Sequence, residues 1–108
     1  MKYYIAGPMT GYVCNNFPSF DNAKAKLLKM GQEVVSPADI ARTEGWLNHD
    51  GTEKENDQPP AARDFVKRDL DHIYECNAMY MLKGWEKSVG ARAEHAVAVW
   101  LGLEIMYE

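Results

Sequence analysis

A carboxylate one turn inside a predicted helix is the group in this chain best placed to do chemistry. Ser88 is a favourable N-cap residue, and the apolar spacing after it predicts a helix that carries Glu94. Gly90 and Ala91 lie one turn before Glu94, so almost no side chain fills the space beside it on that face. Unpaired N–H groups and the helix dipole favour a bound anion there and keep a nearby carboxylate ionised. The stretch 84–95 therefore predicts an anion-binding pocket with a reactive glutamate.

A second carboxylate, Asp69, falls within the apolar stripe of another predicted helix. The stripe consists of residues spaced three and four apart, namely Ala62, Phe65, Val66, Leu70 and Ile73. A carboxylate on a core-facing stripe is costly unless it is hydrogen-bonded or faces a cavity. Two interpretations stay open: Asp69 pairs with Lys67, Arg68 or a helix end, or it has a functional role.

An alternating series of strands and helices must position these carboxylates. In order, the patterns predict strand 3–6, helix 17–30, strand 33–36, a short helix begun by Ser36, helix 62–73, strand 78–82, the helix after Ser88 and strand 103–107. The first long helix has apolar positions at Phe20, Ala23, Leu27 and Met30. The last helix has them at Ala93, Ala96, Val97, Trp100 and Leu101.

Short connections between alternating elements imply a parallel sheet with helices on both sides. The expected fold class is therefore α/β, a three-layer α/β/α arrangement with a flavodoxin-like or Rossmann-like parallel sheet of four to five strands. In such sheets, ligands bind outside the carboxyl ends of the strands. The loop with Gly7 and Thr10 and the loop before Glu94 both follow strands. We expect the two loops to line one crevice.

Composition limits the kinds of protein that this chain can be. With 108 residues, 46% of them apolar, the chain is expected to form one domain over residues 1–108. A net charge of −4 argues against polymeric nucleic acid and anionic membranes as partners. Cys14 and Cys76 form no CxxC pair and have no histidine at metal-ligand spacing, so we expect free thiols, no metal and no cofactor. No apolar run suits a signal peptide or a membrane span, which predicts a cytoplasmic protein.

Residues 43–60 read as a long acidic loop that ends in two prolines. Loops of this length in small domains are usually lids or disordered segments. Trp46 is one of its two large apolar side chains. It either stacks on a ligand base or pins the loop to the protein body.

Three segments together resemble the nucleoside 2-deoxyribosyltransferase superfamily. They are Tyr4-Ile5-Ala6-Gly7-Pro8-Met9, then Arg68-Asp69-Leu70 followed by Cys76-Asn77-Ala78, and Ser88-Val89-Gly90-Ala91-Arg92-Ala93-Glu94-His95. The chain is most similar to a short, poorly characterised branch that phages often encode, which is similar to 2′-deoxynucleoside 5′-phosphate N-hydrolases. The resemblance spans nearly the whole chain except the middle loop.

The resemblance implies cleavage of the N-glycosidic bond of a deoxynucleoside or its 5′-monophosphate. Glu94 matches the nucleophile that attacks the anomeric carbon and forms a glycosyl-enzyme intermediate. Asp69 matches a second carboxylate that assists leaving-group protonation or holds the nucleophile and the sugar in place. Two nearby carboxylates should raise the pKa of one of them, so an acid and a nucleophile can coexist at neutral pH.

The resemblance also suggests residues that bind the substrate. Ser88 matches a residue at the 5′ group, and a plain N-cap is its other role. The other candidates are Gly7, Thr10, Gly90, Trp46 and Arg92, with either Tyr4 or Tyr12 as the site tyrosine. Arg92 contacts either a phosphate or only solvent. His95 is expected to be structural. Family members are typically homodimers or larger, which implies a homo-oligomer.

Three functions fit these residues. The first is an enzyme, either an N-hydrolase or a deoxyribosyltransferase. The second is a catalytically silent module that binds or senses a nucleotide, and the third is a glutamate-dependent NAD glycohydrolase. The pair Asp69 and Glu94 favours an enzyme, because a pure binding protein needs no nucleophile facing its ligand. Nothing in the chain specifies a substrate as large as NAD. The identity of the base stays open, and we expect residues 43–60 to recognise it.

Overall fold

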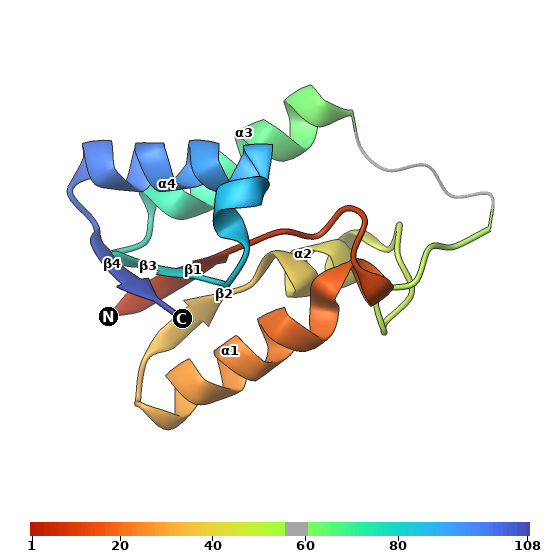
Figure 1. Ribbon diagram of the computed structural model, residues 1–108, viewed down its shortest axis with the longest axis horizontal. Helices are drawn as coiled ribbons and strands as arrows, with labels where there is room; N and C mark the ends of the chain where they lie inside the picture. The colour runs from red at the N-terminus through yellow and green to blue at the C-terminus, as the bar shows by residue number, and fades with distance from the viewer. Residues whose placement is uncertain (56–60) are drawn as a thin grey trace.

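A four-stranded parallel sheet forms the centre of the computed structural model, which describes residues 1–55 and 61–108 (Figure 1). The strands are β1 (Lys2–Ala6), β2 (Glu33–Val35), β3 (Ala78–Met81) and β4 (Glu104–Tyr107), in the spatial order β2-β1-β3-β4. Each neighbouring pair is parallel. Strand β3 is buried along its whole length, as its continuous apolar sequence predicts. The α/β class and a sheet of four strands are confirmed.

Helices cover both faces of this sheet. Helices α1 (Phe17–Lys29) and α2 (Pro37–Glu44) pack on one face, and α3 (Ala62–Tyr74) and α4 (Val89–Leu101) on the other (Figure 1). Short 3-10 turns, η1 (Val13–Asn16) and η2 (Trp85–Lys87), follow β1 and β3. None of the described helices is long and apolar enough to cross a membrane.

Strand β1 divides the core into two clusters because successive side chains point to opposite faces. Tyr3 and Ile5 pack with α1 and α2. Tyr4 and Ala6 pack on the α3 and α4 side, together with Ile73. This alternation sends the Tyr4 side chain toward the two helices that carry the candidate carboxylates.

Helix α1 follows its predicted spacing except at its end. Phe20, Ala23 and Leu27 are buried, but Met30 is 48% exposed. The expectation that Met30 belongs to the apolar stripe is wrong because the helix stops at Lys29, and Gly31 then turns the chain with a φ of +80°. Cys14 and Cys76 are free thiols, as expected.

The buried stripe predicted for α3 is largely wrong. Ile73 is buried, but Ala62, Val66 and Leu70 are exposed, the last two by 48% and 37%. Val66 and Leu70 lie four residues apart on one side of α3, and that side is exposed, whereas Ile73 packs into the core. The first turns of α3 also extend past the strands (Figure 1).

Helix α4 is also rotated relative to the apolar spacing of its sequence. Its buried residues are Ala91 and Ala98, and Val97 packs against the core. The other apolar positions that share the predicted helical spacing are exposed, namely Ala93, Ala96, Trp100 and Leu101.

The acidic loop begins later than its composition suggests. Helix α2 continues through Glu44, and Gly45 ends it with a φ of +80°. Leu47 is buried and forms an isolated antiparallel bridge with Glu53. This part of the loop therefore lies against the protein body. The remainder of the predicted loop, residues 56–60, lies outside the described residues.

Gly7 provides a test of how closely β1 and β3 approach at their carboxyl ends. A Cβ atom on Gly7 would lie 2.7 Å from the Leu82 side chain, which is fully buried. We expect Gly7→Ala to lower the free energy of unfolding by about 2 kcal/mol because of this overlap. Gly90→Ala is the matched control, since no atom lies within 4 Å of that Cβ position, and its effect should stay within about 1 kcal/mol. Urea denaturation of both variants measures the difference. Equal stability of Gly7→Ala and the wild type would contradict the packing argument.

Candidate active site

The loops after β1 and β3 meet at the carboxyl edge of the sheet. The Leu82 backbone N–H donates a hydrogen bond to the Ala6 carbonyl oxygen at 2.8 Å. Farther along, a Cβ atom on Gly84 would lie 2.9 Å from the Tyr12 hydroxyl oxygen, so these two residues are in close contact. Strand β1 leads to a helix on one face and β3 to a helix on the other. The two loops thus meet in direct contact at the switch point of the sheet, and a crevice between them stays a prediction.

Tyr4 and Glu94 form the central contact of the site. The Tyr4 hydroxyl donates a hydrogen bond of 2.7 Å to Oε2 of Glu94. Tyr4 is fully buried, and Glu94 lies partly buried on the inner side of α4. Between the two candidate site tyrosines, Tyr4 therefore contacts the carboxylate, whereas Tyr12 is 45% exposed in the loop after β1.

Asp69 lies on the inner side of α3, in an ion pair with its neighbour Arg68. The Asp69 side chain is 17% exposed, and its Oδ1 accepts from Arg68 at 2.9 Å and 3.0 Å. Arg68 also pairs with Glu44, at the end of α2. The pairing with Arg68 that we considered from the sequence is thus present. Asp69 is also close enough to Glu94 for their charges to interact.

Burial dominates the electrostatics of this pair. It raises the pKa of Glu94 to about 8, against the lowering effect of the Tyr4 hydrogen bond and with a further raising effect from Asp69. Burial also raises the pKa of Asp69, against the lowering effect of Arg68. The pKa of Tyr4 is raised well above its usual value by burial and by Glu94. The expectation that the helix N-terminus keeps Glu94 ionised is wrong, because removal from water outweighs it.

The first turn of α4 combines a cap with open space. The Ser88 hydroxyl oxygen accepts a hydrogen bond from the Ala91 backbone N–H at 3.1 Å, which confirms its N-cap role. Gly90 is exposed, and a Cβ atom there would meet nothing within 4 Å. Arg92 is exposed, and its guanidinium makes no hydrogen bond or ion pair within the described ranges 1–55 and 61–108. The turn has room for a ligand beside Gly90.

Gly7 and Thr10 have different positions in the loop after β1. The absence of a side chain at Gly7 is explained by its contact with Leu82. Thr10 is exposed at the turn. Thr10 is thus accessible to a ligand, whereas Gly7 serves the packing of β1 against β3.

Trp46 packs the loop after α2 onto the protein. It is partly buried against the core cluster of α1 and α2, and its indole N–H donates to Glu44 Oε1 at 3.1 Å. The same Glu44 oxygen accepts from Arg68. Of the two roles considered for Trp46, the geometry favours pinning the loop. Through Glu44 and Arg68, Trp46 also connects indirectly to Asp69.

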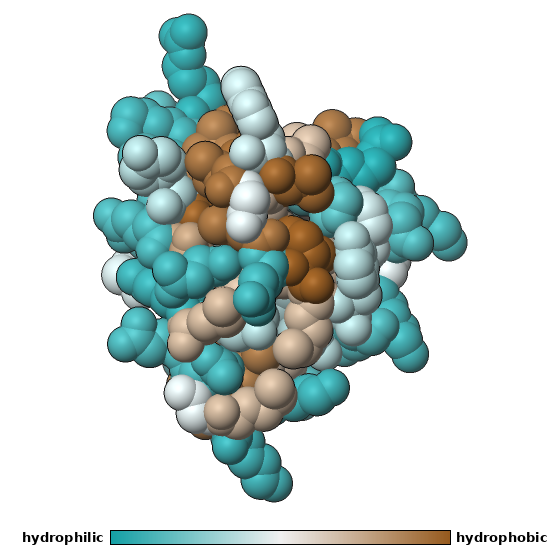
Figure 2. All heavy atoms as spheres, turned by 90° about the vertical axis from the view of Figure 1, so that its left-hand side faces the viewer, coloured by the Kyte–Doolittle hydropathy of each residue, from teal (hydrophilic) through white to brown (hydrophobic). Residues whose placement is uncertain are grey.

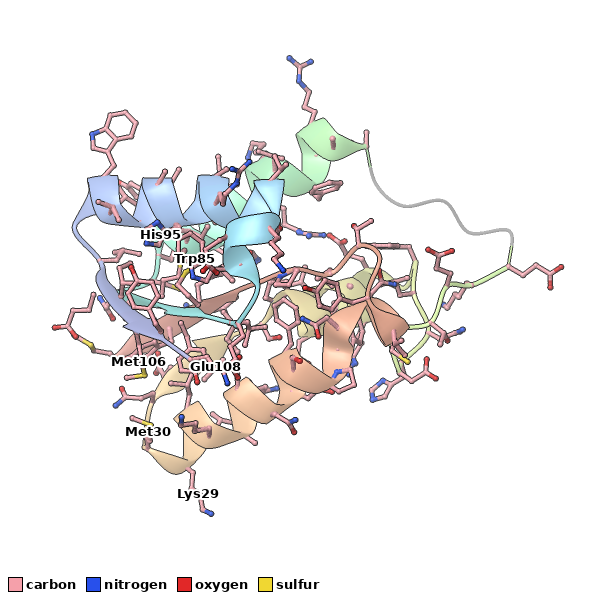
Figure 3. All side chains as sticks on the ribbon, viewed as in Figure 1. Lys29, Met30, Trp85, His95, Met106 and Glu108 are labelled. Atoms are coloured by element: carbon pink, nitrogen blue, oxygen red, sulfur yellow. The ribbon has the colours of Figure 1, made fainter. Side chains whose placement is uncertain are left out.

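His95 has the structural role expected of it. Its ring stacks on Trp85 with centroids 4.4 Å apart, and the two side chains lie next to each other in Figure 3. Its Nε2 lies 2.9 Å from the Tyr107 hydroxyl oxygen. The side chain therefore joins α4 to the loop after β3 and to β4, away from Glu94.

Sequence reasoning missed Glu44 as a member of the site, and it considered Arg68 only as a partner of Asp69. Arg68 interacts with both Asp69 and Glu44, and its charge also acts on Glu94. Glu44 was grouped with the acidic loop because α2 was expected to be short. One feature of the sequence indicates Arg68: it directly precedes Asp69 on a helix. A carboxylate on the inner side of that helix needs a positive charge close by.

Comparison with known proteins supports the same fold. Among solved structures, the chain is similar to a 2-deoxyribosyltransferase from the psychrotolerant bacterium Bacillus psychrosaccharolyticus. The TM-score is 0.67 at 22% sequence identity, over 99% of this chain and 71% of that chain. The expected likeness to the nucleoside 2-deoxyribosyltransferase superfamily is confirmed at the level of the fold. The chain belongs to the family described as Domain of unknown function (DUF4406), which matches residues 1–107. No curated protein matches its sequence.

The raised pKa of Glu94 predicts how stability depends on pH. The folded protein holds the Glu94 proton up to about pH 8, whereas the ordinary pKa of 4.5 lets the unfolded chain release it earlier. The wild type should therefore lose stability as pH rises from 5 to 8. Glu94→Gln removes this loss, so its stability relative to the wild type should increase by about 3.5 kcal/mol over that interval.

Denaturation curves at several pH values measure this difference. Glu33→Gln, at an exposed position on β2, is the control and should follow the wild type. A Glu94→Gln variant whose stability runs parallel to that of the wild type from pH 5 to 8 would show that Glu94 is ionised throughout.

Proposed function

We propose that this protein cleaves the N-glycosidic bond of a deoxynucleoside or a deoxynucleoside 5′-monophosphate through Glu94. The observation that carries the proposal is the pairing of Glu94 with Tyr4 at 2.7 Å, beside Asp69. A buried carboxyl with a fixed donor and a second carboxyl close by suits attack at a sugar carbon. The fold similarity to a 2-deoxyribosyltransferase supports the same reaction class.

The reaction follows from the two carboxyl groups. Ionised Glu94 attacks the anomeric carbon, the bond to the base breaks, and the acid form of Asp69 gives its proton to the leaving base. The sugar is then held as an ester of Glu94. Water attacks the same carbon, returns a proton to Asp69 and releases Glu94. If a second base attacks in place of water, the protein acts as a transferase.

Tyr4 and Arg68 prepare these groups for their roles. The Tyr4 hydroxyl stabilises the ionised form of Glu94, which is the form that attacks. Arg68 holds the Asp69 carboxyl in place from the neighbouring position on α3. Burial raises the pKa of Asp69 and so favours its acid form, against the lowering effect of Arg68. The two groups can therefore act as nucleophile and acid in one site.

The substrate's two ends have separate places in this proposal. The 5′ group would lie at the first turn of α4, near Ser88 and the open side of Gly90. The base would enter a pocket of about 470 Å³ between α2 and α3, lined in part by Val35, Ser36 and Arg68. The lining of this pocket combines apolar side chains with hydroxyl, guanidinium, imidazole and carboxyl groups, which supply both apolar contact and hydrogen-bond partners for a base.

A catalytically silent nucleotide-binding module is the second candidate. The pKa of about 8 favours it, because about nine in ten Glu94 side chains are then protonated at pH 7. A protonated carboxyl donates a hydrogen bond to a ligand but does not attack it. The two candidates differ in whether a base is released.

Release of free base tests the enzymatic proposal. The protein is incubated with a panel of deoxynucleosides and their 5′-monophosphates, with and without an acceptor base, and the products are separated by chromatography. We expect Glu94→Ala to reduce release at least about 100-fold, and Asp69→Asn to reduce it by a similar factor. Glu33→Gln is the control with wild-type activity. Nucleotide binding without release of base would support the silent module instead.

The pH dependence of kcat/KM distinguishes nucleophile from acid. The Asp69→Asn variant isolates Glu94, because the wild type also needs the acid form of Asp69, and the loss of that proton at higher pH opposes the rise. If Glu94 attacks, kcat/KM of Asp69→Asn rises about tenfold per pH unit and levels off near pH 8, where Glu94 is ionised. The tyrosine variants are made in the same background. Tyr4→Phe removes the donor that favours the ionised form, so the midpoint should move to higher pH. Tyr12→Phe is the matched control at the other candidate tyrosine and should leave the midpoint unchanged. In Asp69→Asn, a rate that falls above pH 8 would assign Glu94 the acid role.

A further inference from the structure

Arg68 contacts only one of the two carboxyl oxygens of Asp69. Its Nε donates to Oδ1 of Asp69 at 3.0 Å, and its Nη2 lies 2.9 Å from the same oxygen. A guanidinium beside a carboxylate frequently bonds the two oxygens separately, through two parallel N–H groups. Within residues 1–55 and 61–108, no hydrogen-bond donor contacts Oδ2 of Asp69. One oxygen of this carboxyl group is therefore held, and the other is free to carry a proton.

Glu44 holds the remaining end of the Arg68 guanidinium. Its Oε1 accepts a hydrogen bond from Nη1 of Arg68, and the same oxygen accepts from the indole N–H of Trp46 at 3.1 Å. Glu44 is the last residue of α2, and Gly45 then ends the helix with a φ of +80°. Two donors on one oxygen restrict the positions that this carboxylate can take. The guanidinium is thus held from α2 at one end while it reaches Asp69 with the other.

We propose that Glu44 is a positioning residue for the acid: it holds Arg68 on Oδ1 of Asp69 and so leaves Oδ2 to carry the proton that goes to the leaving base. This inference rests on the proposed function. In the step concerned, the O–H bond at Oδ2 breaks and its proton joins the base. The electron pair of the C–N bond to the sugar stays with the base, and Asp69 becomes a carboxylate.

The planar shape of the guanidinium explains why a contact at Nη1 matters. Its N–H groups lie in a rigid fork, so a partner at Nη1 also fixes the direction in which Nε and Nη2 point. Without Glu44, Arg68 is free to turn and to bond both oxygens of Asp69. That arrangement favours the carboxylate, because a proton on either oxygen would then meet an N–H group. The contact with Glu44 therefore preserves the acid form.

The charge of Glu44 acts in the same direction as its position. Burial has the largest effect on the pKa of Asp69 and raises it, Arg68 lowers it, and Glu44 raises it. The charged and titratable groups that interact with Asp69 come from four elements, namely Arg68 and His72 of α3, Glu44 of α2, Glu94 of α4 and Tyr4 of β1. Glu44 and Arg68 also line the pocket of about 470 Å³ in which we place the base. The pair thus lies on the side from which the proton would leave.

A double-mutant cycle of kcat/KM tests the proposal. Glu44→Gln removes the charge and keeps the size of the side chain. The pKa of Asp69 should then fall, so less of the protein combines acid Asp69 with ionised Glu94, and we expect kcat/KM to fall at least about tenfold. In the Asp69→Asn background, the same substitution should change kcat/KM less than about twofold, because no proton is left at that position. A merely structural role of Glu44 would lower kcat/KM equally in both backgrounds.

Glu104→Gln is the control with the same change of charge. Glu104 is exposed on β4, at the opposite edge of the sheet from β2, the strand that leads into α2. Figure 2 faces this side of the molecule, where α4 ends with the exposed apolar residues Val99 and Leu101. We expect Glu104→Gln to have the kcat/KM of the wild type. Circular dichroism establishes that each variant is folded.

Carbon-13 NMR of the Asp69 carboxyl group gives a readout that needs no activity. Its signal is assigned by its absence in Asp69→Asn and is followed as the pH rises. We expect the midpoint of this titration to lie at lower pH in Glu44→Gln than in the wild type. Glu44→Asp keeps the charge, so its midpoint should lie between the two.

The outcomes separate this inference from the proposed function. An unchanged midpoint in Glu44→Gln would overturn the role of Glu44, and so would an equal loss of kcat/KM in both backgrounds. A wild type that releases no base would contradict the proposed function, whatever the NMR titration shows. A wild type that releases base, together with an unchanged midpoint, would contradict only the inference about Glu44.

Discussion

The hydrogen bond between Tyr4 and Glu94 joins the two parts of the molecule on which the site depends. Tyr4 lies on β1, which pairs with both β2 and β3, and its hydroxyl is buried under α4. A buried hydroxyl without a partner is costly, and so is a carboxyl removed from water. Each group supplies the partner that the other requires. The contact therefore fixes the position of α4 over the sheet and the position of Glu94 in the site.

The neighbouring charges change the pKa values of the two carboxyl groups, but their effect is smaller than that of burial. Arg68 favours the ionised forms of both Asp69 and Glu94, and Glu44 holds Arg68 from the end of α2. Burial still raises the pKa of both carboxyl groups. In both groups, burial therefore opposes the ionised form that the neighbouring guanidinium favours.

Much of the fold could be predicted from the sequence because local patterns determine it. The apolar run at 78–82, the stop at Gly31 and the Ser88 cap all depend on residues that are close in the chain. The exposed sides of α3 and α4 could not be predicted in the same way. Periodicity shows that apolar residues share a face, but it does not show whether that face meets the sheet or something outside the chain.

Some residues of the candidate site could be predicted because their residue type is unusual at their position. Glu94 beside small residues and Asp69 within an apolar stripe were recognisable as unusual. The choice of Tyr4 over Tyr12 required the alternation of β1, which determines the face that each side chain meets. The role of Glu44 required the true end of α2. Contacts between residues distant in the sequence depend on the packing of whole elements.

The sequence distance between Tyr4 and Glu94 has a consequence for folding. The two residues are 90 positions apart, so the loop that their contact closes includes most of the chain. Contacts of such long range form late, because the entropy of closing the loop must be overcome first. Partly folded chains that contain β1 and β2 therefore have the tyrosine but not its acceptor. The site therefore exists only in chains in which α4 has docked on the sheet.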